Sequence, residues 1–266
     1  MFGGRSPYAR YEVEGVTIRN GGGSFAALYV ISPNGAFNTS YPGPSGSITI
    51  KDNIVTDNSG AEQGGGILAY STGGAVTVSR NIIARNTIMG GDVLGFVGGA
   101  WIGSRTGNIL VANNVVAGNT GGGLYVETFG GRVDIINNTV TGNPWVGLTL
   151  QLQSVAAQVH LYNNIIWSQD YDIIEIRNLQ GGTIDAYNND FDPLKVDTGE
   201  EFPSGSPFAH EGGNINVNPL FENAVGKKGT VLTKWNYFRR ENTELYPHMP
   251  FFTETDKHFN CFFLGG

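Results

Sequence analysis

Apolar and polar residues along the chain follow one short pattern that returns six times. Each copy begins with apolar residues at alternate positions, which is the period of a half-buried β-strand. An asparagine-containing corner and a second short apolar run follow, and a glycine-rich loop then leads to a third run. The first two runs of the copies occupy residues 47–58, 75–86, 109–119, 133–143, 159–169 and 184–189. A looser copy covers residues 16–20.

Asparagine marks both corners of the pattern. It is the non-glycine residue that best tolerates the left-handed backbone conformation of a sharp bend. The anchoring asparagines of the first corner are 28, 33, 24, 26 and 25 positions apart: Asn53, Asn81, Asn114, Asn138, Asn164 and Asn189. The second run ends at Asn58, Asn86, Asn119 and Asn143, and the third run is clearest at residues 66–70, 123–127 and 147–151. Three strands in about 25 residues leave no room for a helix in each repeat.

These Asn corners, together with Gly-Gly-Gly-Ile and Gly-Gly-Gly-Leu segments, resemble the right-handed parallel β-helix of the pectin-lyase-like superfamily, in its secreted bacterial repeat form. The resemblance covers roughly residues 15–220, and residues 213–221 look like the segment that often closes such domains. It implies an all-β solenoid of three-strand coils. Equivalent asparagines would then stack as hydrogen-bonded amide ladders. The scaffold hosts lyases, hydrolases, esterases and adhesins, so it implies no single activity.

Composition agrees with a turn-rich β protein and divides the chain in two. The chain has 266 residues with 40 glycines and 26 asparagines, which disfavours helices. We predict a β-helix domain at residues 1–224. In residues 230–264 glycine is absent and nine of the 35 residues are aromatic. We therefore separate residues 225–266 as an aromatic-rich tail, either a cap over the open end of the solenoid or an extension not native to the domain.

Charge narrows the range of partners. The net charge is −7, and basic residues form no cluster, so we expect neither nucleic acid nor anionic membrane as a partner. No apolar stretch is long enough to span a bilayer, so no membrane insertion is expected. Cys261 is the only cysteine, which excludes an intrachain disulfide. The first residues show no apolar signal-peptide core, and a secreted or cell-surface location is expected from the resemblance.

The outward positions of the third run supply the main candidate site. Its columns include the aromatic and amide residues Tyr70, Trp101, Tyr125 and Gln151, which suit sugar rings and hydroxyl groups. Glu127 and Glu175 lie two coils apart, about 10 Å by strand spacing. That spacing can bring their carboxyl groups to the separation of an inverting glycosidase pair. Arg177 can neutralise a uronate or hold a carboxylate. An ordinary polar face with a Glu175–Arg177 surface ion pair is the alternative.

The outward positions of the first run supply a secondary candidate site. Asp134, His160 and Asp185 occupy one column on three consecutive coils, about 5 Å apart. Two carboxylates at that spacing can orient an imidazole for acid–base chemistry. A solvated face with a favourable charge ladder is the alternative interpretation.

Loop acids raise the question of a metal. Ca²⁺ takes several oxygen ligands, and Asp170, Asp172, Asp190 and Asp192 are candidates. They are dispersed, so we predict no cofactor and keep Ca²⁺ as an alternative.

The leading hypothesis is an extracellular carbohydrate-active enzyme, a hydrolase or lyase that binds a polysaccharide along the third run, with Glu127 and Glu175 as acid and base. A non-catalytic adhesin-type β-helix that binds glycans or a protein is the main alternative. An esterase on the same scaffold is a further one, although no Gly-x-Ser-x-Gly nucleophile elbow is present.

Overall fold

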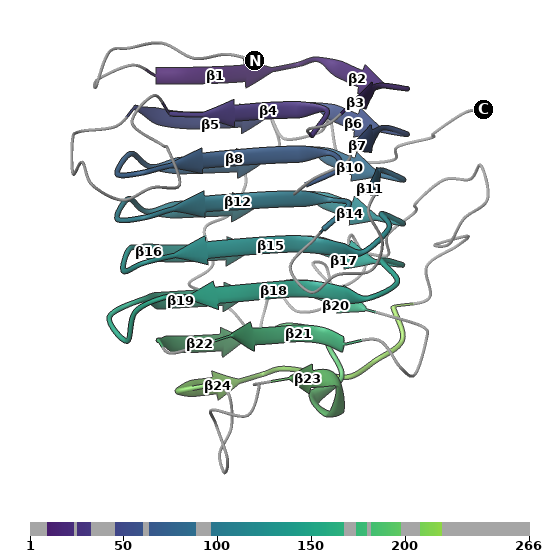
Figure 1. Cartoon of the computed structure of the whole chain (residues 1–266). Helices are drawn as coiled ribbons and strands as arrows, with labels where there is room; N and C mark the ends of the chain where they lie inside the picture. The colour runs from purple at the N-terminus through teal and green to yellow at the C-terminus, as the bar shows by residue number, and fades with distance from the viewer. Residues whose placement is uncertain are drawn as a thin grey trace, which may run out of the picture. The chain divides into compact units, whose positions relative to one another are not determined.

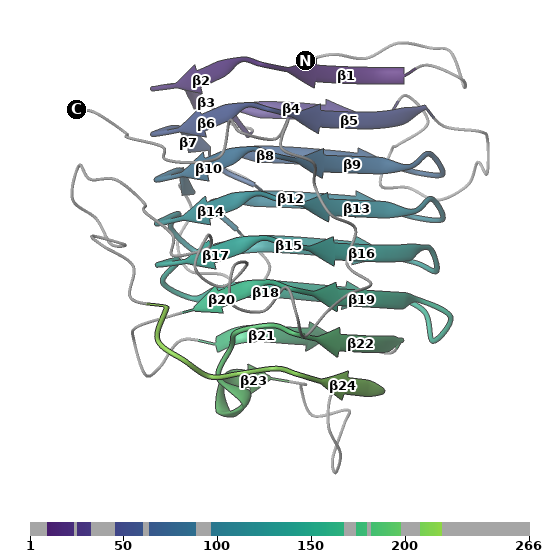
Figure 2. The same cartoon turned by 180° about the vertical axis from the view of Figure 1, so that it is seen from behind.

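Strands that are equivalent in successive coils pair side by side, and every pairing is parallel (Figures 1 and 2). The computed structural model describes residues 10–23, 26–32, 46–60, 64–88, 97–167, 174–179, 182–197 and 208–219. Three sheets run along the stack, one for each strand of the coil, as the sequence pattern predicts. This arrangement confirms the all-β fold of three-strand coils.

The first sheet contains, in spatial order, β1 (Arg10–Glu14), β5 (Ser47–Lys51), β9 (Val76–Ser79), β13 (Ile109–Ala112), β16 (Arg132–Ile136), β19 (Gln158–Tyr162), β22 (Thr183–Tyr187) and β24 (His210–Gly212). The second contains β2 (Thr17–Arg19), β6 (Ile54–Thr56), β10 (Ile82–Ala84), β14 (Val115–Ala117), β17 (Thr139–Thr141) and β20 (Ile165–Trp167).

The third sheet contains β4 (Leu28–Ile31), β8 (Ile67–Ser71), β12 (Ala100–Ser104), β15 (Gly122–Thr128), β18 (Val146–Leu152), β21 (Ile174–Leu179) and β23 (Val196–Asp197). A small sheet contains β3 (Gly22–Gly23), β7 (Ser59–Gly60) and β11 (Thr87–Ile88), and a 3₁₀ turn, η1 (Pro193–Lys195), precedes β23.

Alternate residues of the first sheet point into a narrow apolar core between the three sheets. One inward column shows the principle, because each of its members pairs with the next and is at most 1% exposed: Ile48, Val76, Ile109, Val133, Val159 and Ile184. Burial of one such side chain contributes roughly 1.5–3 kcal/mol to stability. A slip of one residue would turn the whole column outward, so the core also determines the register.

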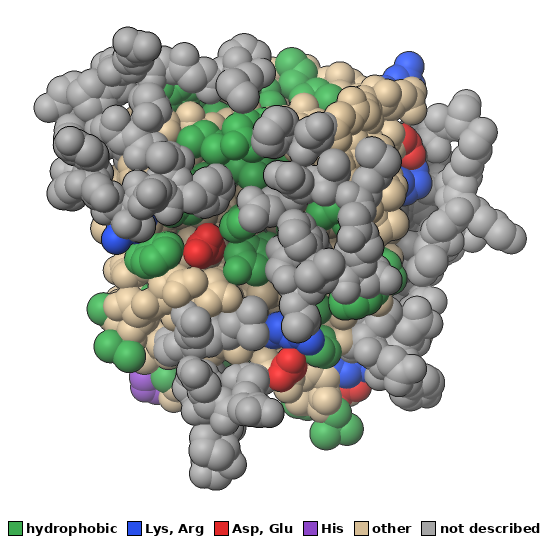
Figure 3. All heavy atoms as spheres, viewed as in Figure 1, with side chains coloured by type: hydrophobic (Ala, Val, Ile, Leu, Met, Phe, Trp, Pro, Cys, Tyr) green, Lys and Arg blue, Asp and Glu red, His purple; other side chains and the backbone are tan. Residues whose placement is uncertain are grey.

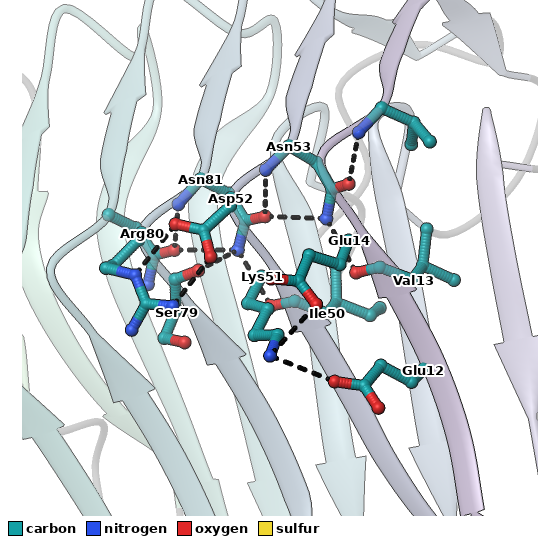
Figure 4. A network of polar contacts seen from close by, with 12 residues as sticks. Glu12, Val13, Glu14, Ile50, Lys51, Asp52, Asn53, Ser79, Arg80 and Asn81 are labelled. Carbon is teal, nitrogen blue, oxygen red and sulfur yellow. Dashed lines mark hydrogen bonds and ion pairs between the residues drawn. The ribbon is translucent and has the colours of Figure 1, made fainter. Parts of the chain in front are cut away.

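The first-corner asparagines form a continuous buried ladder. The Oδ1 atom of each one after Asn53 accepts hydrogen bonds from the backbone N–H and the side-chain amide of the asparagine one coil earlier, as Asn81 does from Asn53 at 3.0 Å each (Figure 4). The Nδ2 group also donates to a carbonyl of the coil before, as Asn81 does to Ile50. The members are Asn53, Asn81, Asn114, Asn138, Asn164, Asn189 and Asn214. A second ladder contains Asn58, Asn86, Asn119 and Asn143.

The residue before each ladder asparagine makes the bend. It has a positive φ, between 54° and 65° at both corners, as at Asn113, Asn137 and Gly142. The Asn-Asn pair therefore divides two tasks, since its first residue takes the left-handed conformation and its second enters the ladder. Arginine takes the bend at Arg80 and Arg85, where this conformation is less favourable.

Each of these two arginines is held by an aspartate one coil earlier. Arg80 binds both carboxylate oxygens of Asp52 at 2.6 and 2.7 Å, as Figure 4 shows, and Arg85 binds those of Asp57 at 2.7 and 2.8 Å. Two parallel hydrogen bonds are the strongest form of this contact. The Arg85 guanidinium lowers the pKa of Asp57, and the ionised carboxylate is thus the favoured form.

Hydroxyl groups connect the turns that close the coils after the third strand. Ser71, Ser104 and Thr128 occupy one column and are fully buried. Ser104 accepts a hydrogen bond from the N–H of Gly107 in its own turn and donates to the carbonyl of Gly74 in the turn before. Hydrogen bonds therefore connect this closing turn to the turn of the coil before it.

The chain divides into two units, residues 1–217 and residues 218–266. Residues 220–266 lie outside the described part, so the predicted boundary at residue 224 and the alternatives for the tail stay predictions. Among the described residues, no helix is long and apolar enough to cross a membrane.

Removing one ladder amide should destabilise the protein strongly. In Asn138→Ala, the backbone N–H and side-chain amide of Asn114 lose their acceptor in a buried site. We expect the free energy of unfolding to fall by about 2–4 kcal/mol, because unsatisfied buried donors cost about 1–3 kcal/mol each. Urea denaturation measures this change.

Asn137→Gly is the matched control, since the neighbouring residue is only half-buried and has a φ of 58°, which glycine adopts freely. It should change stability by no more than about 0.5 kcal/mol. Equal losses in the two variants would contradict the division of tasks between the paired asparagines.

Candidate functional site

The outward face of the third sheet carries the main predicted site. Strand pairing places Trp101, Tyr125, Thr149 and Arg177 in one column. Tyr70, Gly103, Glu127 and Gln151 form the neighbouring column, two residues farther along the strands. The structure thus brings together five predicted residues on adjoining coils: Tyr70, Trp101, Tyr125, Glu127 and Gln151. In Figure 3, acidic side chains lie beside hydrophobic ones on this face.

The aromatic side chains of this face are packed rather than open, which corrects the expectation that they are exposed. Trp101 and Tyr125 are 9% and 8% exposed, and their rings meet edge to face at 5.2 Å. They belong to an apolar cluster with Ala26, Leu68, Tyr70 and Val97. Large residues on adjacent coils are only one strand spacing apart and cover one another, which alternation along a single strand does not reveal. We call these six residues the outer cluster.

A glycine shapes the surroundings of Glu127. A Cβ atom at Gly103 would lie 2.5 Å from the ring of Tyr70, so only glycine lets this ring lie across the coil between Tyr70 and Glu127. Tyr125 donates a hydrogen bond from its hydroxyl to Gln151 at 3.3 Å. Gly103 is not among the residues predicted for this face. The signal for its role is a glycine at an outward strand position, in a column between Tyr70 and Glu127.

Glu127 is the half-buried acid at the edge of the outer cluster. Burial raises its pKa, and hydrogen bonds from the side chains of Gln153 and Trp101 oppose this rise only in part. Burial also raises the pKa of Tyr125, and the charge of Glu127 adds to this effect. No lysine or arginine in the described part of the chain forms an ion pair with Glu127. The site therefore favours a protonated carboxyl group more than water does.

Glu175, the predicted partner of Glu127, lies elsewhere. The pairing of strand β21 places Glu175 in the column of Gly123 and Gly147. Along the strand direction, this column lies four residues before the column that contains Glu127. Four residues along the strands and two coils across them separate the two backbones by about 16 Å. The Glu175 carboxylate is 1% exposed, accepts a hydrogen bond from the N–H of Asp192 and lies 3.7 Å from the Lys195 ammonium group. It anchors η1 and cannot form the expected pair.

Arg177 is also engaged within the protein. Its Nε atom donates to Asp197 at 2.9 Å, on the next coil of the same column. The predicted contact with Glu175 is replaced by this one, because the Glu175 carboxylate is engaged with Lys195 and the N–H of Asp192. Arg177 remains on the third-sheet face, two coils from Tyr125.

The predicted column of the first sheet is present and contains one residue more than expected. Asp134, His160 and Asp185 share an outward column of the first sheet, and His210 extends it. The Nδ1 atom of His160 lies 2.8 Å from Asp134, and its Nε2 atom lies 4.0 Å from Asp185. The Nδ1 atom of His210 lies 2.8 Å from Asp185. We call these four residues the Asp–His column.

The sequence analysis missed His210, although its spacing identifies it. Asp134, His160 and Asp185 each stand four positions before a ladder asparagine, and His210 stands four before Asn214. The intervening residues 198–207 disguised the repeat. Tyr162 flanks the column, and its ring stacks on that of His160 at 5.6 Å.

The structure gives no support to a Ca²⁺ site. In the described residues, no group of three or more His, Cys, Asp or Glu side chains could hold a metal ion. Asp190 is buried and Asp192 caps η1 through the N–H of Leu194, while Asp170 and Asp172 lie outside the described residues.

Parallel coils of three strands with stacked asparagines define the class of the protein as a parallel β-helix. The family model described as "Right handed beta helix region" matches residues 43–191, which is more than half of the chain, and the chain belongs to this family. Comparison with curated proteins and with solved structures gave no match. The family assigns the scaffold, whereas an activity must be argued from the side chains.

The two glutamates should respond oppositely to neutralisation. Because burial raises the folded-state pKa of Glu127, its ionised form costs stability at neutral pH. Glu127→Gln should therefore raise the free energy of unfolding at pH 7.5, and the gain should shrink as the pH falls and the wild-type carboxyl is protonated. Urea denaturation at several pH values measures both effects.

Glu175→Gln is the comparison, because it removes the charge that pairs with Lys195 in a buried site. It should lower the free energy of unfolding by about 3 kcal/mol, the usual cost of breaking a buried ion pair. A loss of stability in Glu127→Gln at pH 7.5 would count against the environment assigned to Glu127.

Proposed function

We propose that the protein binds a glycan chain against the third-sheet face, with Glu127 at the centre of the contact. The observation that carries the proposal is a half-buried carboxyl group with a raised pKa and no cationic partner among the described residues, set beside Tyr70, Trp101 and Tyr125. A protonated carboxyl group donates one hydrogen bond and accepts others, which suits sugar hydroxyls. The small exposed fractions of Trp101 and Tyr125, 9% and 8%, supply apolar contact for a ring face.

Recognition without cleavage is the form that the geometry favours. An inverting glycosidase needs two carboxyl groups about 6.5–9.5 Å apart, and a retaining one needs about 5–5.5 Å. Glu127 and Glu175 are about 16 Å apart by strand spacing, and Glu175 is sequestered. This separation supports the adhesin-type alternative over the two-carboxylate mechanism.

Cleavage with Glu127 as the proton donor is the second candidate function. A carboxyl group whose pKa is raised in an apolar pocket is suited to general acid catalysis near neutral pH. Beside the outer cluster, the described residues provide this one acid, and cleavage would need a second group from the ligand or from elsewhere in the chain. An extracellular or cell-surface location belongs to the same proposal, because a glycan partner fits it.

A panel of neutral and acidic polysaccharides tests the proposal with the wild type and Glu127→Ala. Binding is measured by glycan array and calorimetry, and cleavage by the release of reducing ends. We expect binding of at least one polymer, weakened about 10–100-fold in Glu127→Ala, since a hydrogen bond to a charged or strongly polar group contributes about 1.5–3 kcal/mol.

Thr183→Ala, on the exposed first-sheet face, is the control and should bind as the wild type does. Binding without turnover supports recognition, and turnover that Glu127→Gln abolishes supports the second candidate. Absence of binding to every polymer, or equal binding by the wild type and Glu127→Ala, would overturn the proposal.

A further inference from the structure

The last coil within the described residues, 208–217, is joined to the preceding coil by contacts on several sides. Strand β24 pairs with β22 over three residues. Asn214 ends the first ladder by accepting both hydrogen bonds of Asn189, at 2.9 and 3.0 Å. Ile215 forms an isolated bridge with Asp190. Phe208 packs against Phe191 in the core, and further backbone hydrogen bonds join this coil to the preceding one. Two of the contacts between the coils contain a titratable side chain.

The first titratable contact is the end of the Asp–His column. His210 is 71% exposed, and its Nδ1 atom lies 2.8 Å from Asp185 on the preceding coil. Asp185 also faces the Nε2 atom of His160 at 4.0 Å. A protonated imidazole would add a positive charge to the donor side of the His210–Asp185 hydrogen bond and so make the contact an ion pair with the carboxylate.

The second titratable contact is a buried carboxyl group. Asp190 is 3% exposed and occupies the column of Ile165 and Ile215, where earlier coils have apolar residues or threonine. Its Oδ1 atom accepts a hydrogen bond from the N–H of Val217 at 3.0 Å, which ties the end of the coil to the preceding one. An ionised carboxylate in this setting is poorly solvated, whereas a protonated one keeps the hydrogen bond without the charge.

We propose that residues 208–217 form a proton-operated latch, in which acid tightens the last coil through His210 and Asp190 together and neutral pH loosens it. The two groups act in the same direction for different reasons. Protonation of His210 strengthens an attraction across the coils, and protonation of Asp190 removes a buried charge. Their positions on different faces of the coil make the two contributions separable by mutation.

The surrounding groups are consistent with this direction. His210 faces Asp185 and Tyr187 from β22 and has Glu211 beside it on β24. His160 faces Asp134 and Arg132 from β16, Asp185 and Tyr187 from β22, and Tyr162 on its own strand. Its protonation would place a cation between two carboxylates. The described groups that face Asp190 are the apolar side chains of Ile165 and Ile215 and the N–H of Val217.

The pH range follows from Asp190. Burial raises the pKa of Asp190 to about 6, while the hydrogen bond from Val217 opposes this rise. A raised folded-state pKa gives stability that is complete below the ordinary aspartate value and is lost as the pH rises through about 6. Between pH 7 and pH 5, this group alone should reduce opening of the coil about tenfold.

A range of pH 5.0–7.5 isolates the latch from the carboxylates of the first coils. Arg85 lowers the pKa of Asp57, so the Asp57–Arg85 contact loses strength only below the ordinary aspartate range. Glu127 can titrate nearer this range, but it lies on β15. The readout must therefore be local to residues 208–217.

Hydrogen–deuterium exchange with mass spectrometry on the full chain provides that readout. Protection factors, corrected for the intrinsic pH dependence of exchange, are compared for peptides covering residues 208–217 and residues 132–141. We expect protection of residues 208–217 to rise at least tenfold from pH 7.0 to pH 5.0, with little change at residues 132–141. Asp190→Asn should show at pH 7.0 the protection that the wild type reaches at pH 5.0, and should lose most of the pH dependence.

Asp192→Asn is the matched control, since Asp192 lies two residues away on η1 and caps Leu194 outside the latch. It should behave as the wild type does, and His210→Gln should reduce the remaining pH dependence. If Asp190→Asn does not fold, the pH dependence of exchange in the wild type alone tests the proposal. Constant or falling protection on acidification, or an unchanged pH response in Asp190→Asn, would overturn the proposal.

Discussion

Vertical hydrogen bonding between stacked asparagine side chains is the interaction on which the rest of this structure depends. Each ladder amide satisfies donors and acceptors of two coils at once, in a site from which water is excluded. An unsatisfied amide there would be costly, so the coils can stack in only one register. In that register, the inward columns of Ile and Val bury their apolar surface. Every outward position inherits its place from this register.

Much of the scaffold could be predicted from the sequence because each of its parts repeats. Asn-Asn pairs such as Asn137 and Asn138 reveal a bend followed by a buried amide, and alternation along residues 133–136 reveals the inward face. The Asp–His column was accessible in the same way, since its residues keep a constant distance from the ladder. Repetition in the sequence thus allows the position of each residue in the coil to be predicted.

The third-sheet site could be predicted only in part, because its properties come from contacts between unequal coils. Residue alternation places Glu175 outward, but register alone places it in the column of Gly147, and residues 192–195 then enclose it. Likewise, the pairing of Arg177 with Asp197 requires a strand, β23, that carries no repeat signature. The burial of Trp101 and Tyr125 depends on neighbours one coil away. Local pattern contains none of this information.

The scaffold therefore leaves few side chains for function, and the structure sorts them further. Glu175 and Arg177 complete internal contacts, the outer cluster is largely packed, and Glu127 retains a partly exposed carboxyl group in an apolar setting. Function on such a solenoid depends on single residues that break the repeat rather than on the repeat itself. Glu127 and the terminal coil are the two places to which we assign such a role as proposals.

The central claim is that the amide ladders hold the coils in register, and hydrogen exchange of the ladder backbone N–H groups tests it most directly. Each of these N–H groups donates to the Oδ1 atom of the ladder asparagine one coil later, and the donors are Asn53, Asn81, Asn114, Asn138, Asn164 and Asn189. Residue-resolved exchange by nuclear magnetic resonance should find the interior members, Asn81 to Asn164, as slow as the core strand residues beside them, with opening only by global unfolding. Exchange at the rate of exposed corner amides would contradict the account.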